Sequence, residues 1–128
     1  MATSQPLEED AQSLVAIGFT SIFEKDIKAL KKKYPRIRDD VKLIVSQIQE
    51  GKIPGDQIPG ISYPVFKVRL KNSDSQKGTR GGYRLIHYLK TPQNVVLLTI
   101  YSKTDQEDIT AKQIQEIISN YLKQNPQT

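Results

Sequence analysis

The stretch Phe66-Lys67-Val68-Arg69-Leu70-Lys71 alternates apolar and basic residues without exception. Two more apolar stretches of strand length follow it, YRLIHYL at 83–89 and VVLLTIY at 95–101. Polar residues 72–82 link the first two stretches, and TPQN at 91–94 is a turn between the second and the third. Because connections this short join neighbouring strands, the three stretches predict an antiparallel meander.

Alternation also assigns the side chains of the first strand to two faces of the sheet. The apolar side chains face one side, where a layer of helices is expected to cover them. The basic side chains face the other side at intervals of ~6–7 Å, close to the phosphate spacing of an extended nucleic-acid strand. These are Lys67, Arg69 and Lys71. If the second strand pairs antiparallel with the first, Arg84 joins them on the same face, together with Ile86 and Tyr88.

Helices are predicted on both sides of this meander. After a short apolar run at 14–19, Ser21-Ile22-Phe23-Glu24 has the S-x-x-E form of a capping box. Apolar residues at helical spacing define one face over 23–34 and another over 37–48, and Pro35 ends the first helix. A last helix is predicted at 110–123, and the Gly- and Pro-rich residues 51–64 form a rigid loop.

The predicted fold class is therefore α+β, in a small single domain of order β-α-α-β-β-β-α. We expect an antiparallel sheet of three to four strands, packed on a helical hairpin and followed by a C-terminal helix. The domain is predicted to span residues 13–123, between a flexible acidic segment at 1–12 and a frayed end at 124–128.

The charge of the chain is unevenly distributed. The 128 residues include 19 Lys and Arg against 14 Asp and Glu, a formal net charge of +5. Residues 67–90 contain seven of the basic residues and one acid, so their net charge is +6 and the rest of the chain carries −1. An excess confined to one segment is typical of a site for a polyanion rather than of a generally cationic surface.

Composition excludes several classes of site. With no cysteine and one histidine, the chain cannot form a disulfide scaffold, a thiol nucleophile, a Cys-based zinc site or an H-E-x-x-H helix. No group of His, Asp and Glu has metal-ligand spacing, so we expect no metal and no cofactor. Residues 1–10 carry three acids and no base, and no stretch approaches the ~18 apolar residues of a membrane span. We therefore expect a cytoplasmic protein without a membrane partner.

Simpler interpretations stand beside the functional one. Basic residues on a strand also protect a solvated sheet edge against aggregation, and Gly81-Gly82 fits a hairpin turn. Lys31-Lys32-Lys33 suits the C-terminal end of a helix dipole, and a second nucleic-acid contact there stays open.

The single histidine and the late acids are also expected to serve structure. His87 shares a face with Leu85 and Leu89, which predicts a hydrogen-bonded histidine on the core side, away from the basic face. Asp105, Glu107 and Asp108 are expected in a turn before the last helix, as helix-start residues rather than as a catalytic pair.

Three motifs, in this order, resemble the RelE/ParE superfamily of bacterial toxins. They are KVRLKN at 67–72, GGYRLIHYL at 81–89 and LLTIYSKTDQEDI at 97–109. FEKDIKAL at 23–30 also fits, and the resemblance covers about residues 18–122. It is closest to the RelE and HigB branches, whose members are ribosome-dependent mRNA endoribonucleases (mRNA interferases) held inactive by a partner antitoxin.

The resemblance implies a metal-independent reaction in which the 2′-OH attacks the adjacent phosphate and positioned cations stabilise the charge. Lys67 and Arg69 take the place of the family's paired strand cations, and Arg84 would stabilise the transition-state oxyanion. Lys103 stands where a RelE-type enzyme carries an Arg that protonates the leaving 5′-oxygen, and Tyr101 is near enough to donate instead or to stack on a base. Further RNA contacts are expected from Lys71, Lys77, Arg80, Tyr88 and Lys90.

The implied partners are mRNA in the ribosomal A site and a cognate antitoxin. The helix at 110–123 is the expected docking or mobile element for that antitoxin, because it follows Lys103. Two other functions stay open. ParE relatives poison DNA gyrase by protein contact and do not need the basic face, and a catalytically silent RNA-binding module would need the face but no chemistry.

Overall fold

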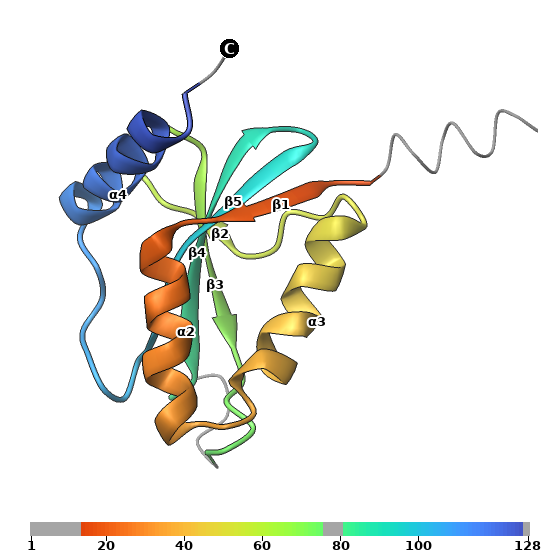
Figure 1. Cartoon of the computed structure of the whole chain (residues 1–128), viewed down its shortest axis with the longest axis vertical. Coiled ribbons are helices and arrows are strands. Elements are labelled where there is room, and N and C mark those ends of the chain that lie inside the picture. The colour runs from red at the N-terminus through yellow and green to blue at the C-terminus, as the bar shows by residue number, and fades with distance from the viewer. Residues whose placement is uncertain (1–13, 76–80, 127–128) are drawn as a thin grey trace, which may run out of the picture.

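The computed structural model describes residues 14–75 and 81–126. Figure 1 shows a small α+β domain, which confirms the predicted fold class. Its elements in chain order are β1 (Ala16–Phe19), α2 (Ser21–Lys33), α3 (Ile37–Gln49), β2 (Asp56–Gln57), β3 (Val65–Leu70), β4 (Tyr83–Thr91), β5 (Asn94–Ser102) and α4 (Ala111–Gln124). None of the helices in the described ranges is long and apolar enough to cross a bilayer.

The sheet has five strands in the order β1-β5-β4-β3-β2. The predicted meander is confirmed, because β3, β4 and β5 pair antiparallel, and β2 pairs antiparallel with β3. The prediction of a wholly antiparallel sheet of three to four strands was wrong, since β1 runs parallel to β5. No hairpin links β1 to a neighbour, so the sequence held no turn that fixed its direction.

Strand β2 was missed because it is two residues long and lies inside the predicted loop 51–64. Gly55 precedes it with a positive φ of 94°, and a Cβ at this position would lie 2.4 Å from the carbonyl oxygen of Lys67. Only glycine therefore allows the loop to pass this close to β3.

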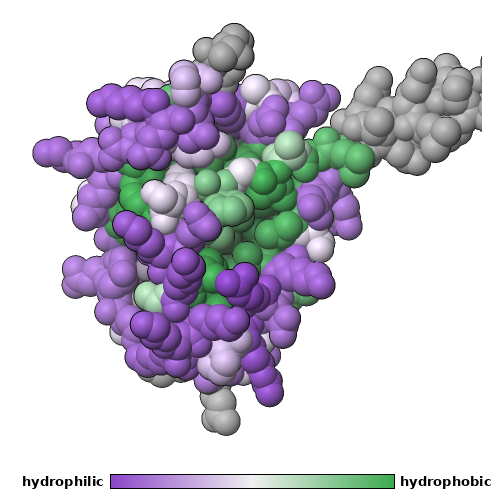
Figure 2. Space-filling model, in the orientation of Figure 1, coloured by the Kyte–Doolittle hydropathy of each residue, from purple (hydrophilic) through white to green (hydrophobic). Residues whose placement is uncertain are grey.

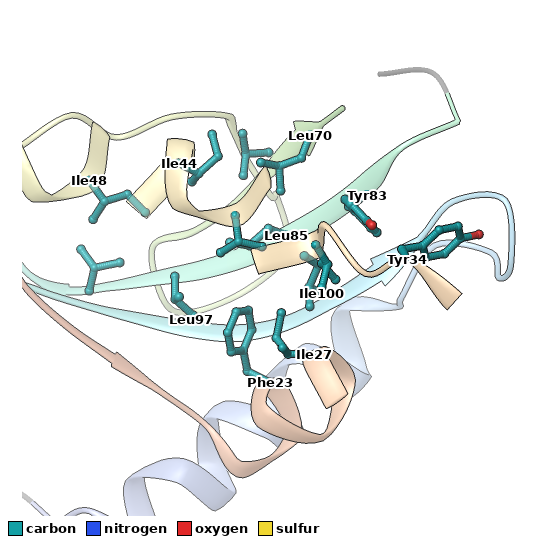
Figure 3. Packing of buried hydrophobic residues seen from close by; sticks show 14 of the residues in the cluster. Phe23, Ile27, Tyr34, Ile44, Ile48, Leu70, Tyr83, Leu85, Leu97 and Ile100 are labelled. Atoms are coloured by element: carbon teal, nitrogen blue, oxygen red, sulfur yellow. The ribbon is translucent and has the colours of Figure 1, made fainter. Parts of the chain in front are cut away.

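Two apolar clusters cover the two faces of the sheet. Helices α2 and α3 run in opposite directions from a short connection and cover one face, where the side chains of Phe23, Ile44 and Leu85 meet (Figures 1 and 3). Helix α4 covers part of the other face through Ile114 and Ile118. The expected helical hairpin and C-terminal helix are thus present, on opposite sides of the sheet.

The helix ends agree with prediction except at the first cap. Thr20, not Ser21, is the N-cap of α2, and its Oγ1 accepts from the Phe23 N–H at 2.9 Å. Helix α3 ends before Gly51, whose φ is 91°, and Thr110 and Gln113 form the predicted capping box of α4. Thr20 is preferred as the cap because its hydroxyl also donates to Leu98 O at 2.6 Å, which ties the helix start to β5.

The unpaired edge of β5 beyond β1 is satisfied by α2. The Asp26 carboxylate accepts from the Thr99 hydroxyl at 2.5 Å and from the Ile100 N–H at 3.2 Å. Burial raises the pKa of Asp26, while the hydrogen bonds from Thr99 and Ile100 act in the opposite direction. This contact fixes α2 against the strand that leads into the candidate site.

His87 is a structural histidine, as predicted. It is 1% exposed, stacks on Phe66 and shares a hydrogen bond of 2.8 Å between its Nε2 and Pro54 O. It lies on the face covered by α2 and α3, because it pairs with Phe66 and follows the alternation of Leu85. Burial lowers the pKa of His87, and the contact with Pro54 opposes this only in part.

Stability should therefore fall in mild acid through His87, the only histidine in the chain. Its folded-state pKa lies below the unfolded value of about 6.5, so its contribution is complete above that pH and is lost as pH falls towards the folded pKa. The slope is at most about 1.4 kcal/mol per pH unit, the limit for one proton.

Urea unfolding of wild type and His87→Gln between pH 7.5 and 5 measures this effect. Gln keeps a donor for Pro54 O and does not titrate, so the variant should not show this fall in the free energy of unfolding as the pH is lowered. Asp26 acts with the opposite sign at lower pH, and its contribution cancels in the difference between the two proteins. Parallel pH profiles would show that His87 does not cause the decline.

Candidate nucleic-acid interface

The strand register places the predicted cations on one face of the sheet. Lys67 pairs with Ile86, Arg69 pairs with Arg84, and Arg84 in turn pairs with Tyr101 on β5. Residues directly opposite each other on neighbouring strands point to the same face. Ile86 and Tyr101 belong to the cluster under α4, so the cations share the face that α4 partly covers.

This face is less open than the alternation predicted, because α4 lies over part of it. Arg84 is only 5% exposed, and its Nη1 donates to the Tyr83 carbonyl at 3.2 Å. Lys67 is half-buried, whereas Arg69 is exposed on the strand. The cations therefore differ in exposure: the guanidinium on the middle strand is buried, whereas the charges on β3 are accessible.

Asp108 joins three of the predicted residues. Its Oδ1 accepts from the Tyr101 hydroxyl at 2.9 Å and from Lys103 Nζ at 3.2 Å, and its Oδ2 lies 3.8 Å from Lys67 Nζ. Two strands and the loop after β5 thus meet at one carboxylate. We call Lys67, Tyr101, Lys103 and Asp108 the carboxylate cluster.

The pKa shifts in the carboxylate cluster have clear causes. Burial, followed by the hydrogen bond to Asp108, raises the pKa of Tyr101 to about 12, so the phenol is a proton donor at neutral pH. Burial alone would raise the pKa of Asp108. Tyr101, Lys103 and Lys67 together lower it, so the carboxylate is ionised.

The loop between β5 and α4 is tied to two other parts of the fold. The Lys103 N–H donates to Gly82 O at 2.9 Å, just before β4. The Asp105 carboxylate accepts from Lys33 Nζ at 2.8 Å and from the Tyr34 hydroxyl at 3.1 Å, at the end of α2. These contacts hold Lys103 beside the strand that carries Arg84.

Asp105, Glu107 and Asp108 precede the last helix as predicted, but the expectation that they serve as helix-start residues was wrong. Helix α4 begins at Ala111 with no acid in its first turn. Asp105 anchors the loop and Asp108 lies in the carboxylate cluster, a role that sequence reasoning missed. Alternation applies only within strands, so it gave no direction for a loop side chain. Lys33 is likewise engaged by Asp105 at the end of its helix.

Other predicted RNA-binding residues lie apart from the cluster. Tyr88 is buried with its ring edge on Tyr63, so it packs in the core and presents no face to a base. Lys90 lies six residues beyond Arg84 on β4, about 20 Å along the strand. Lys71 is exposed just after β3. Lys77 and Arg80 lie outside the described residues.

A second surface feature is an apolar groove between α2 and α3. Figure 2 shows apolar surface between these helices, bordered by hydrophilic side chains. Phe19, which is 50% exposed, and Phe23 line it together with Val45. The apolar face of α4, in contrast, is buried against the sheet. The groove between α2 and α3 is therefore an exposed apolar surface, whereas α4 turns its apolar face to the sheet.

Within residues 14–75 and 81–126, no group of three or more His, Cys, Asp and Glu side chains lies close enough together to hold a metal ion. No protein-family model matches the chain, and no curated protein matches it.

Arg69 and Arg84 face each other across β3 and β4, and like charges in this position destabilise a sheet by about 0.2–1 kcal/mol. We expect Arg69→Gln to raise the free energy of unfolding by about this amount at low salt. The gain should shrink near 1 M NaCl, where the Debye length is about 3 Å, but persist in part because Arg84 is buried.

Urea unfolding at low and high NaCl tests this prediction. Lys25→Gln is the matched control, because it removes the same charge from an exposed position of α2. Equal effects of the two substitutions at low salt would show that the pairing carries no repulsion.

Proposed function

We propose that this protein is a metal-independent endoribonuclease that cleaves ribosome-bound mRNA, the toxin of a type II toxin–antitoxin system. The observation that carries the proposal is the convergence of Lys67, Arg84 and Lys103 with the Tyr101 hydroxyl at one end of the sheet. Cations and a protonated phenol suit a phosphodiester whose own 2′-OH is the nucleophile, because the protein then supplies position and charge stabilisation.

The burial and position of each cation suit it to a different role in the reaction. Arg84 is buried on the central strand and its Nη1 donates to Tyr83 O, so it is suited to stabilise charge on the phosphate oxygens in the transition state. Lys67 and Arg69 lie on β3, where they hold the phosphate and stabilise the 2′-alkoxide that forms as water takes the 2′-OH proton. The proton for the leaving 5′-oxygen comes from Tyr101 or Lys103, which lie on β5 and just beyond it.

The tyrosine fits the donor role through its protonation. A phenol with a pKa of about 12 keeps its proton at neutral pH. It can still protonate an alkoxide, which is the stronger base. The products of this route are a 2′,3′-cyclic phosphate and a free 5′-hydroxyl.

We further propose that the antitoxin places an amphipathic helix in the groove between α2 and α3. The groove floor is apolar, and along its sides three basic residues outnumber the one acid, Glu24; the basic residues are Lys28, Arg38 and Lys42. This arrangement favours a helix with an apolar stripe and acidic flanks.

The nuclease proposal is tested with programmed ribosomes and primer extension. Wild type should cut the message in the A site, and Lys67→Gln should cut it about 10²–10³-fold more slowly, the loss typical of one electrostatic stabiliser. Lys67 is half-buried on the strand surface, so the variant should fold.

Lys25→Gln controls for loss of charge and should cleave like wild type. Intact message with active ribosomes contradicts the proposal. Inhibition of gyrase supercoiling without RNA cleavage would support the ParE-like alternative.

The groove proposal is tested by co-purification with the small protein encoded by the neighbouring reading frame. Phe19→Asp should abolish the complex, because it places a charge in the apolar groove. Leu43→Asp is the control, since Leu43 is 68% exposed on α3 but does not line the groove. Equal retention of the partner by both variants contradicts this docking site.

A further inference from the structure

Asp108 makes contacts that the fold does not require. Its side chain is about half exposed, and α4 is capped without it by Thr110 and Gln113. It belongs to neither apolar cluster. Its described partners are the three other members of the carboxylate cluster, Lys67, Tyr101 and Lys103.

These three donors bind both oxygens of one singly charged anion. Tyr101 and Lys103 donate to Oδ1, while Lys67 approaches Oδ2 from the other strand. A phosphodiester group also carries one negative charge over two terminal oxygens, so the same donors suit it. The Asp108 carboxylate therefore occupies the position in which an RNA phosphate would contact the same three donors.

Asp108 also neutralises part of the positive charge of the carboxylate cluster in the free protein. Without it, the ammonium groups of Lys67 and Lys103 would face one site with no anion between them. With it, they share one carboxylate, which offsets their repulsion. Asp56 lies opposite Lys67 in β2, yet the carboxylate within 4 Å of the Lys67 ammonium is that of Asp108.

We propose that Lys67, Tyr101 and Lys103 form a subsite for one phosphodiester group of single-stranded RNA, which Asp108 fills in the free protein and leaves when RNA binds. The inference rests on the proposed function, because it assigns a ligand to the same cations. The movement is local. Asp105 stays anchored to α2 and Thr110 stays at the start of α4, so only the residues between them need to rearrange.

The subsite is tested by RNA binding without cleavage. The probe is a fluorescent single-stranded RNA decamer with 2′-O-methyl groups, which lacks the nucleophile, and the readout is fluorescence anisotropy. Asp108→Asn keeps the shape and an acceptor for Tyr101 but removes the competing charge. We expect it to bind about 3- to 10-fold more tightly than wild type, the range for two partly exposed ion pairs.

Two controls distinguish the subsite from a general charge effect. Glu107→Gln makes the same change in charge at the neighbouring exposed residue and should bind within twofold of wild type. In a Lys67→Gln background, Asp108→Asn should gain less than it does in wild type, because one of the released cations is missing.

Equal affinity of Asp108→Asn and Glu107→Gln, weaker binding by Asp108→Asn, or no binding by any of the proteins would overturn the subsite. The nuclease proposal fails separately. If wild type leaves ribosome-bound message intact while Asp108→Asn still gains affinity for RNA, the nuclease proposal is refuted and the subsite stands. If wild type cleaves the message but Asp108→Asn gains no affinity, the subsite is refuted and the nuclease proposal stands.

Discussion

The placement of Arg69 directly opposite Arg84 is the constraint on which the candidate site depends. Two like charges in this position are unfavourable, so the pairing persists because the two apolar clusters fix the register of β3 and β4. A slip of one residue would move the cations into the core and the apolar residues outward. The fold therefore holds like charges opposite each other at a cost, which the proposed phosphate ligand would offset.

The loop after β5 completes the site from a different part of the chain. Asp105 fixes this loop to the end of α2, and the backbone of Lys103 is bonded to Gly82 beside β4. Lys103 and Asp108 are thereby brought to Lys67, which lies on β3. The site consequently depends on long-range contacts, and the ion pair between Lys33 and Asp105 affects the cluster without belonging to it.

Alternation within the strands accounts for what the sequence could predict. It correctly separated Val68 from Lys67, and it placed His87 on the face opposite Arg84. Helical spacing and capping likewise located α3 and α4. The parallel pairing of β1, the short β2 and the position of Asp108 were not predictable, because they depend on which distant segments meet. Burial of Tyr88 against Tyr63 also needed the tertiary structure, since strand alternation does not say which loop or helix covers a face.

The end groups of the RNA products report whether these cations position a phosphodiester for attack by its own 2′-OH. Message recovered from ribosomes treated with the protein in EDTA should end in 2′,3′-cyclic phosphate on the upstream fragment and a free 5′-hydroxyl on the downstream one. Cleavage that leaves a 5′-phosphate and a 3′-hydroxyl, or no cleavage by folded protein, would contradict the account.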